Sequence, residues 1–436
     1  MKKPYLSIPI GILIITLFVC KVDAQLSNCN VFLKGNYLEV GINWNGAYGS
    51  SATAPPGYHP RGGAPVINSS VCGSTCDSTG GLGFVCDPDK DGWTVGSPTY
   101  YGDYFLPGTP QEGWSIMADG KQANSWNGPG CDTSGPRIMD SAMTGSNVSY
   151  FDTGSKRIGI WQGMYDSILI TQVTSLDTAH TYFKVKAILK NISHSTRHNV
   201  FYLRTVDPDN AEAVGGDFTT INNIVHQWPD SGRSQVSCIG VEPGDVPLPK
   251  SYMSLGSSDS NTRCFIIRLG LSPTFGNLDS MYRADGGYGD SADYIYSGGD
   301  TLDVGIALVW KLGDLPSIDT GVDSAIIEYA YIFRTVDVDS ALTHTKAVLT
   351  GIANINGAEQ IVAYPNPFKD EINVSGLTAS DHVVIYDMMG RKVNSWVVSK
   401  DGNNTFAING ISSGGYILEV LDKNGQKKTR IPLQKL

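Results

Sequence analysis

The segment DPDKDGW carries the densest run of metal-ligating side chains in the sequence. Asp87, Asp89 and Asp91 alternate before Gly92, which matches the first half of a calcium-binding loop. Calcium takes several oxygen ligands, and alternating carboxylates can converge on one ion when the chain curls around it. The twelfth position of the loop is Pro98, where an EF-hand requires Glu, so the segment is not an EF-hand. We predict a non-helical calcium site at these three aspartates, and the alternative is a solvated acidic turn.

Carboxylates that could form a catalytic pair are abundant elsewhere in the sequence. Glycoside hydrolases need only two carboxyl groups at a suitable separation, and spacing alone does not select a pair here. Asp207 and Asp209, with Asn210, also form a second oxygen-rich turn that could hold a metal. The sequence contains no Gly-x-Ser-x-Gly elbow, His-Glu-x-x-His segment or phosphate loop. The candidates for a catalytic pair are Asp103, Glu112, Asp207 and Asp209.

Aromatic residues gather in the same part of the chain as the predicted calcium loop. Exposed rings stack on sugars, while neighbouring Asp and Asn side chains accept hydrogen bonds from sugar hydroxyls. The alternative is that these rings form a small core of their own. The candidates for stacking on a glycan are Trp93, Tyr101, Tyr104, Trp114 and Trp126.

The N-terminus has the features of a secretory signal peptide. Lys2 and Lys3 precede an apolar run that ends at Cys20, and the run is too short to span a bilayer comfortably. We predict cleavage after Ala24, so that residues 1–24 are removed. The alternative is a lipoprotein signal with Cys20 as the lipidated residue, although Val19 stands where a small residue is expected.

Seven cysteines follow the predicted leader, and all of them lie before residue 265. An exported chain meets an oxidising compartment, so disulfides are expected, and the odd number leaves at least one thiol unpaired. Spacing cannot give the connectivity. A zinc site in the cluster near His59 is the alternative, but structural zinc sites usually need four ligands. The disulfide candidates are Cys29, Cys72, Cys76, Cys86, Cys131, Cys238 and Cys264.

The charge of the chain differs by region. The whole chain carries −10, and residues 1–24 contribute +2, so the mature chain carries −12. Residues 360–436 contain nine Lys or Arg against seven Asp or Glu, which gives +2 and leaves −14 on residues 25–359. Nucleic acid and anionic lipid both require positive charge, so the acidic charge of residues 25–359 argues against them as partners of this region.

The elements that must position these residues are predicted to be β-strands. Apolar and polar residues alternate along several segments, separated by short turns, which indicates an all-β fold with antiparallel sheets. We expect a large antiparallel β-sandwich in residues 25–350, which we call the body, with a long disulfide-stapled loop region at 43–135. A helix is predicted at 336–351, and 351–361 serve as a linker. The clearest strand segments are 167–176, 180–192, 199–206, 301–312 and 324–336.

Residues 362–436, which we call the tail, form a separate compact pattern. Tyr364-Pro-Asn-Pro-Phe opens it, a hairpin is predicted at Met389-Gly390, and Asn424-Gly425 indicates a second tight turn. About seven short strands predict a small β-sandwich that folds alone. With "VVIYDMMGRKV" and "ISSGGYILEV", the tail resembles the type A C-terminal sorting domain of the bacterial type IX secretion system. The matching motif residues are Tyr364, Pro365, Asn366, Pro367, Gly390, Gly415 and Tyr416.

The resemblance implies passage through the periplasm and the outer membrane, recognition by the type IX machinery, and removal of the tail. The body would then be released or anchored to surface lipopolysaccharide. The body itself is similar only to uncharacterised secreted regions that precede such tails. We therefore expect a secreted or cell-surface protein whose body is a non-catalytic glycan-binding or adhesion module, with calcium as its possible cofactor. The alternative is a polysaccharide-active enzyme, a glycoside hydrolase or lyase, with a carboxylate pair.

Overall fold

A computed structural model describes most of the chain after the predicted leader. The chain divides into two compact units, Met1–Thr343 with the body and His344–Leu436 with the tail. No helix among the described residues is long and apolar enough to cross a membrane. The described residues are 26–27, 30–50, 52–59, 81–93, 103–104, 111–127, 142–210, 218–242, 244, 246–268, 277–282, 294–343, 361–364, 368–387, 391–408, 410–412 and 414–435.

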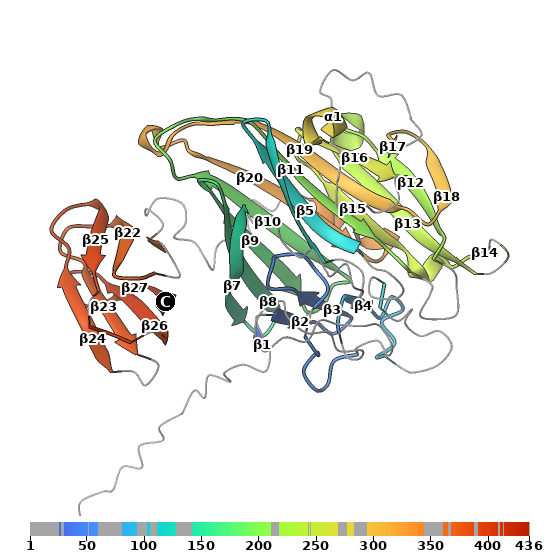
Figure 1. Ribbon diagram of the computed structural model, residues 1–436. Helices are drawn as coiled ribbons and strands as arrows, with labels where there is room; N and C mark the ends of the chain where they lie inside the picture. Colours follow the sequence, from blue (N-terminus) through green and yellow to red (C-terminus); the bar gives the residue numbers. More distant parts are fainter. Residues whose placement is uncertain are drawn as a thin grey trace, which may run out of the picture. The chain divides into compact units, whose positions relative to one another are not determined.

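The described part of the body consists of three antiparallel sheets (Figure 1). The largest has the order β18-β12-β13-β15-β20-β10-β9-β8-β7, with β14 paired to β13; the second is β17-β16-β19-β11-β5-β6, and the third is β1-β2-β3-β4. The strands of the largest sheet are β7 (Met143–Asp152), β8 (Lys156–Tyr165), β9 (Ile168–Asp177), β10 (Tyr182–Asn191), β12 (Thr220–His226), β13 (Ser234–Glu242), β14 (Val246–Pro247), β15 (Met253–Ser257), β18 (Gly299–Leu302) and β20 (Ser324–Ile332). The second sheet contains β5 (Gln111–Ala118), β6 (Lys121–Asn127), β11 (Arg197–Asp207), β16 (Thr262–Ile267), β17 (Tyr294–Ile295) and β19 (Gly305–Leu315). The third contains β1 (Leu26–Ser27), β2 (Asn30–Lys34), β3 (Leu38–Ile42) and β4 (Phe84–Cys86), and the two α-helices are α1 (Leu278–Tyr282) and α2 (Val338–Leu342).

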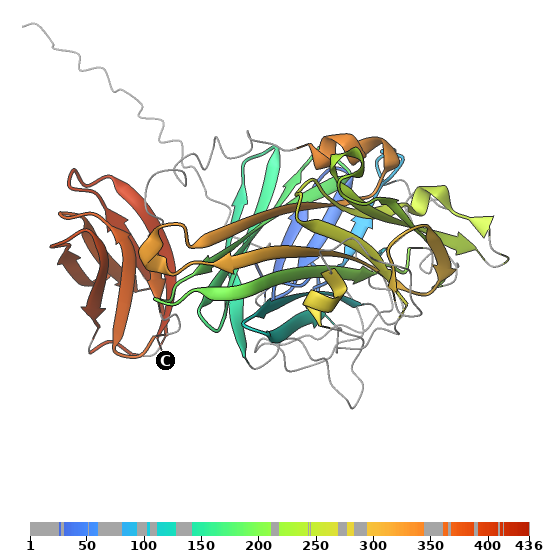
Figure 2. The same ribbon diagram turned by 90° about the horizontal axis from the view of Figure 1, so that it is seen from above.

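The alternation along β10 shows why the sequence forms these sheets. Phe183, Val185, Ala187 and Leu189 are buried, whereas the side chains between them are half-buried. This period of two places these four apolar side chains on the face toward the core. In Figure 2 the long orange strands β19 and β20 run beside green strands, since β19 pairs with β11 and β20 pairs with β10.

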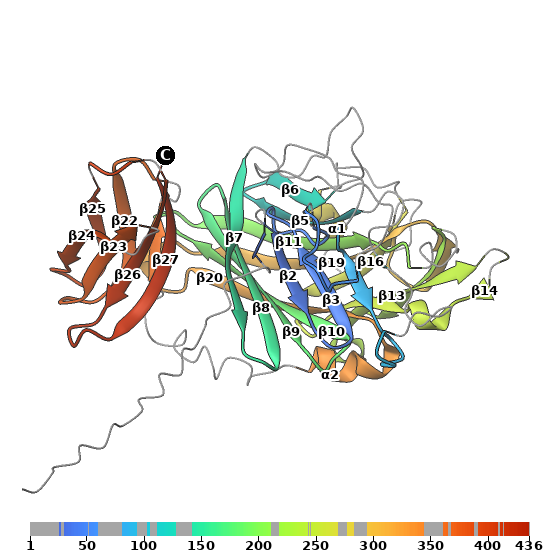
Figure 3. The ribbon, with the colours of Figure 1, turned by 90° about the horizontal axis from the view of Figure 1, so that it is seen from below.

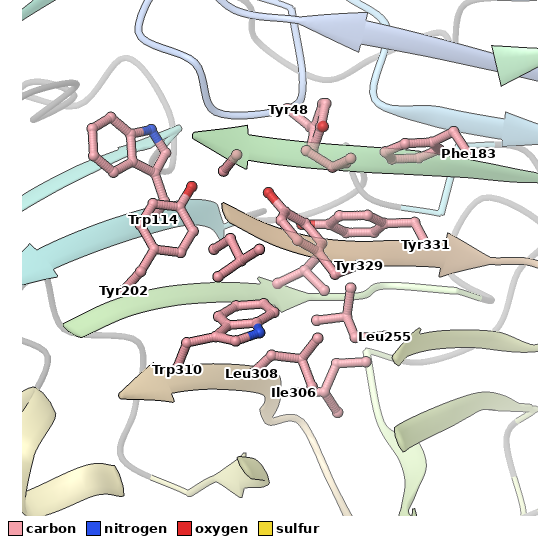
Figure 4. Packing of buried hydrophobic residues seen from close by; sticks show 14 of the residues in the cluster. Tyr48, Trp114, Phe183, Tyr202, Leu255, Ile306, Leu308, Trp310, Tyr329 and Tyr331 are labelled. Atoms are coloured by element: carbon pink, nitrogen blue, oxygen red, sulfur yellow. The ribbon is translucent and has the colours of Figure 1, made fainter. Parts of the chain in front are cut away.

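Aromatic residues fill the space between the two large sheets (Figure 4). Trp310 of β19 packs against Tyr329 of β20, with ring centroids 5.2 Å apart. Phe183 stacks on Tyr331 within the ten-stranded sheet, with centroids 4.7 Å apart and planes at 10°. Offset and edge-to-face ring pairs add to the stabilisation that burial of their area provides.

The four-stranded sheet packs on β8 (Figure 3). Close approach requires glycine here, since a Cβ at Gly159 would lie 2.8 Å from Ile42 of β3. Trp161 of β8 is buried and donates from Nε1 to the carbonyl of Trp44, 2.7 Å away. A Cβ at Gly163 would lie 2.1 Å from this indole, so the glycine makes room for it. The segment after β3, which contains Trp44, is therefore fixed on β8 of the ten-stranded sheet.

The tail contains two sheets, in the orders β21-β22-β25 and β24-β23-β26-β27. Buried residues from both sheets form one core, which includes Ile372, Ile385 and Leu418. The predicted Asn424-Gly425 turn is confirmed, with Gly425 at φ 79° between β26 and β27. The strands are β21 (Val362–Tyr364), β22 (Glu371–Leu377), β23 (His382–Asp387), β24 (Lys392–Val397), β25 (Gly402–Ala407), β26 (Gly414–Leu421) and β27 (Lys427–Lys435).

The predicted fold class is confirmed as mostly β with antiparallel sheets, and several details differ. Within the region 43–135, where the sequence predicts long loops with short hairpins, residues 111–127 form the hairpin β5–β6, which belongs to the six-stranded sheet. The predicted strand at 301–312 is interrupted at Asp303, where β18 ends and β19 begins. The predicted helix at 336–351 is described only as α2, since residues 344–351 lie outside the described residues. The leader also lies outside them, so its assignment stays a prediction.

The predicted disulfide staples are not supported. Cys86, Cys238 and Cys264 are free, buried thiols, because each strand that carries one turns the sulfur into the apolar core. Burial raises the pKa of Cys238 to about 12 and that of Cys264 further still. Cys29, Cys72, Cys76 and Cys131 lie outside the described residues.

Candidate functional site

The acidic loop after β4 is organised around the side chain of Asp87. This carboxylate is buried and accepts hydrogen bonds from the N–H groups of Asp91 (3.3 Å), Gly92 (3.0 Å) and Trp93 (3.2 Å). Asp89 points elsewhere and pairs with Lys250. Among the described residues, Asp87, Asp89 and Asp91 do not bring three ligand atoms within 4.8 Å of one another. Asp87 therefore holds its own loop, and calcium binding by the three aspartates stays a prediction.

The loop presents Trp93 in an unusual backbone conformation. Its φ of 59° lies in the left-handed region, which is strained for a large side chain. The indole Nε1 donates to the carbonyl of Asn36, 2.6 Å away. The ring stacks on His59, with centroids 4.2 Å apart and planes at 7°. The hydrogen bond to Asn36 and the stacking on His59 together fix the position of the half-buried Trp93 ring.

A buried carboxylate, that of Glu39, contacts the His59 side of this stack. Glu39 of β3 is fully buried and accepts a hydrogen bond of 2.7 Å from the N–H of His59. Its Oε1 lies 2.9 Å from Nδ1 of His59 and 2.8 Å from Nζ of Lys34. The Lys34 ammonium also lies over the ring of Tyr58, 5.1 Å from its centroid. We call Lys34, Glu39, Tyr58, His59 and Trp93 the aromatic platform.

The other predicted stacking residues are placed differently. Tyr104 and Trp114 are fully buried in the body core, so they form part of the core instead of a glycan surface. The Tyr104 hydroxyl donates to the carbonyl of Lys250, 2.9 Å away. Tyr101 and the side chain of Trp126 lie outside the described residues.

Asp103 and Glu112, two of the four candidate catalytic carboxylates, have internal partners. Asp103 is fully buried and accepts hydrogen bonds from the N–H groups of Gly83 (2.6 Å) and Phe84 (2.9 Å), which fixes the start of β4. Glu112 of β5 is fully buried and accepts from Nε of Arg204 at 2.6 Å and from Nη2 at 2.9 Å. Neither carboxylate is accessible to a substrate.

The ion pair of Glu112 and Arg204 connects both large sheets and the segment after β3. The Tyr331 hydroxyl of β20 and the N–H of Tyr48 donate to Glu112, and Arg204 donates to Gln172 of β9 at 3.1 Å. Burial raises the pKa of Glu112, while Arg204, the Tyr331 hydroxyl and the Tyr48 N–H oppose the rise. The Glu112 carboxylate thus accepts four hydrogen bonds, and these bonds compensate the loss of water around its buried charge.

The remaining carboxylates, Asp207 and Asp209, lie together with Asp303. Asp207 ends β11, and Asp303 occupies the turn between β18 and β19. One ligand atom from each of the three lies within 4.8 Å of the others. Burial raises the pKa of Asp207 to about 8, and the charge of Asp303 adds to the rise. Asn210 is not part of this group, because its amide donates to the carbonyl of Ser251.

The described motif residues of the tail have structural roles. Tyr416 of β26 is buried, and its hydroxyl donates to the carbonyl of Ser412, 2.7 Å away. The hydroxyl of Tyr364 accepts from the Asn403 amide at 3.0 Å, which joins β21 to β25. Gly415 lies within β26, where it pairs with Gln434. Pro365, Asn366, Pro367 and Gly390 lie outside the described residues.

The end of the tail returns to its opening motif. Phe368 is fully buried and forms a parallel bridge with Lys435. The Lys435 ammonium lies 5.3 Å from the centroid of this ring and donates to the carbonyl of Lys369. A second lysine, Lys428, pairs with the nearly buried Asp381 at 2.7 Å. The last strand of the tail thus contacts its first residues, and the tail is a β-sandwich with a core of its own.

This two-sheet sandwich is a domain with its own core, and the Tyr-Pro-Asn-Pro-Phe motif opens it. Residues 362–434 match the family described as a secretion system C-terminal sorting domain. The tail is therefore a type IX sorting domain, and the protein is exported to the cell surface or outside the cell. The tail also implies interaction with the type IX secretion machinery.

Solved structures similar to the chain are remote. They include a polysaccharide lyase (12% identity, TM-score 0.20, covering 81% of this chain and 42% of that one). PorZ, a surface component of the type IX secretion system of Porphyromonas gingivalis, is 9% identical with a TM-score of 0.16 over 74% of this chain and 64% of PorZ. An α-galactosidase from Lactobacillus brevis is 10% identical with a TM-score of 0.24 over 71% and 40%. The chain spans less than two thirds of each of these proteins, and no curated protein matches it.

Proposed function

We propose that the body is a non-catalytic module that binds glycan at the cell surface after export. The observation that supports this proposal best is Trp93, a half-buried ring in a left-handed backbone conformation. Such strain persists only where the surroundings over-determine it, and it concentrates at binding sites. Adhesion to a glycan-coated surface would follow from the same chemistry.

The surroundings of Trp93 suit a sugar. Sugars present apolar C–H faces to rings and hydroxyl groups to charged or amide partners. The aromatic platform combines the stacked rings of His59 and Trp93 with the Lys34 ammonium at its edge. The fully buried Glu39 holds the imidazole and the ammonium in place. A ring whose position is fixed before binding loses little conformational freedom on binding.

The alternative is a polysaccharide-active enzyme, and only Asp207 and Asp209 support it. Asp103 and Glu112 are engaged inside the body, which leaves this pair from the four candidates. Both remaining side chains are nearly buried, at 3% and 2% exposure. Glycosidases place two carboxyl groups on either side of a sugar, so this burial favours binding over cleavage.

A direct test uses the mature full-length chain on a glycan array, together with a reducing-end assay on the same polysaccharides. We expect retention of at least one glycan class and at least a tenfold loss of affinity in Trp93→Ala. Trp228→Ala is the matched control, since Trp228 is also a half-buried tryptophan of the body. Product release from a bound polysaccharide would overturn the non-catalytic proposal, and equal retention by Trp93→Ala would remove the aromatic platform from it.

The fate of the body after export also belongs to the proposal. Removal of the tail would leave a body attached to surface lipopolysaccharide, where a glycan-binding face can reach other cells. Fractionation of cells followed by detection of the body with and without lipopolysaccharide extraction tests this attachment. A body found only in the medium would show that it is released.

A further inference from the structure

Three carboxylates meet where the chain crosses from one large sheet of the body to the other. β18 belongs to the ten-stranded sheet and β19 to the six-stranded sheet, and Asp303 lies in the turn between them. Val206 pairs with Ile306, so the antiparallel register brings the end of β11 to the start of β19. Asp207 and Asp209 therefore reach Asp303 although nearly a hundred residues separate them in sequence.

The separation of these carboxylates fits a single ion. One ligand atom from each aspartate lies within 4.8 Å of the others. Calcium–oxygen distances are about 2.3–2.6 Å, so oxygens on opposite sides of one calcium ion lie up to about 5 Å apart. The three groups can thus contact one ion with only small side-chain movements.

Asp207 provides a second, independent observation. Its side chain is 3% exposed, yet it makes no hydrogen bond and no ion pair with any residue that the structure describes. Buried carboxylates are normally compensated by donors, as Glu112 and Asp103 are in the same body. Asp207 instead lies within 4.8 Å of ligand atoms of Asp209 and Asp303, so a bound cation would supply the partner that this buried carboxylate lacks among the described residues.

We propose that Asp207, Asp209 and Asp303 bind one calcium ion. The ligands are oxygen atoms only, which suits a hard cation, whereas zinc prefers nitrogen and sulfur. The nearby sulfur of Cys238 lies within hydrogen-bond distance of Asn210 and the carbonyl of Met253, and it is not one of the grouped ligand atoms. Extracellular modules bind calcium with dissociation constants of about 10⁻⁴–10⁻³ M, which suits an exported acidic protein.

The bound ion would stabilise the body by holding parts of its two large sheets together. It would join the end of β11 to the turn that carries the chain from the ten-stranded to the six-stranded sheet. Binding to the folded state alone raises stability as calcium concentration rises. The site lies apart from the aromatic platform in sequence and is proposed independently of any glycan.

The test measures calcium binding to the mature full-length chain after chelator treatment, by calorimetry and by thermal unfolding. We expect one calcium per chain, a melting temperature that rises with calcium concentration, and weaker binding of magnesium. Asp303→Asn should weaken binding at least tenfold; since Asp303 is exposed, this variant tests binding without disturbing the core. Asp207→Asn should do the same and still fold, because the amide has nearly the same size and shape as the carboxyl group it replaces.

Asp89→Asn is the matched control, since it removes a carboxylate from the loop of the sequence-predicted calcium site. Its calcium affinity should equal that of the unaltered chain. The proposal is overturned if the chelated protein binds no calcium, if Asp303→Asn and Asp207→Asn bind it unchanged, or if magnesium binds more tightly. None of these measurements contains a glycan, so they fail or succeed separately from the proposed glycan binding.

Discussion

Nε of Arg204 lies 2.6 Å from Oε1 of Glu112 inside the body, and neither side chain is exposed to solvent. The two residues belong to neighbouring strands, β11 and β5, of the six-stranded sheet. Tyr331 of the opposite sheet donates to the same carboxylate, so the pair bridges the sandwich. A buried pair adds little net stability compared with apolar residues, but a lone partner leaves an uncompensated charge.

Replacing either partner alone should therefore destabilise the body strongly. We expect Arg204→Met and Glu112→Gln each to lower the free energy of unfolding by about 3–5 kcal/mol. The double variant Arg204→Met with Glu112→Leu should recover most of that loss, because no charge remains buried. Denaturant unfolding followed by tryptophan fluorescence measures these differences.

An exposed ion pair of the body supplies the control. Arg233 lies 2.8 Å from Asp339, whose side chain is 89% exposed. Asp339→Asn should change the free energy of unfolding by less than about 1 kcal/mol. A double variant as unstable as the single ones would contradict this account of the buried pair.

The three hydrogen bonds accepted by Asp87 make a separate prediction about the loop that carries Trp93. Asp87→Ala leaves the N–H groups of Asp91, Gly92 and Trp93 without this partner, at a cost of about 1–3 kcal/mol in local stability. Amide hydrogen exchange at residues 87–93 should become faster while the strands of the body stay protected. Asp89→Ala should leave the exchange of this loop unchanged, and equal exchange in both variants would refute the role of Asp87.

The strands of the body could be predicted from the sequence because alternation encodes them locally. The segments at 167–176, 180–192 and 199–206 correspond to β9, β10 and β11. Alternation in β10 even identifies the buried face. The tight turn at Asn424-Gly425 was equally readable, since glycine permits the positive φ that the turn requires.

The candidate sites were only partly predictable because they depend on contacts between distant residues. Asp207 and Asp209 stood out as an oxygen-rich turn, but their partner Asp303 lay inside an apparent strand. Apolar residues alternate through this turn at Leu302, Val304 and Ile306, so no local pattern marks the end of β18. Glu112 lies 92 residues from Arg204, and nothing local marks a charge that a distant strand will compensate. From the sequence alone His59 is a candidate zinc ligand, whereas in the structure its partners include Glu39 and Trp93.

Because the free thiols are buried, we expect them to resist alkylation in the folded protein across the pH range 7 to 10. The thiolate is the reactive form, and burial raises the pKa of Cys238 to about 12. An unfolded thiol has a pKa of about 8.5, so raising the pH from 7 to 10 ionises it, whereas the folded thiol stays protonated. Alkylation followed by peptide mass spectrometry should show fast labelling of Cys238 only in denatured protein. Labelling of native Cys238 that accelerates between pH 7 and pH 10 would contradict its burial.

Phe368 links the opening motif of the tail to the tail core. Shortening this side chain should therefore destabilise the tail and so reduce export. The side chain is fully buried in the tail core, to which Ile372 and Leu433 also belong. Phe368→Ala should lower the free energy of unfolding of the tail by about 3–5 kcal/mol, because it leaves a cavity. Cell fractionation should then show less exported protein and more in the periplasm. Val397→Ala, at a position 63% exposed, is the control and should leave export unchanged.

Deletion of residues 362–436 tests the sorting function itself. The tail has its own core, separate from that of the body, so its removal should leave the body folded. We expect the truncated chain to accumulate in the periplasm, because it lacks the domain that the secretion machinery recognises. Protease resistance of the periplasmic product controls for misfolding. Since the two cores are independent, residues 344–436 fused to a periplasmic reporter should carry it to the cell exterior. A truncated chain that reaches the exterior as efficiently as the full chain would refute this role.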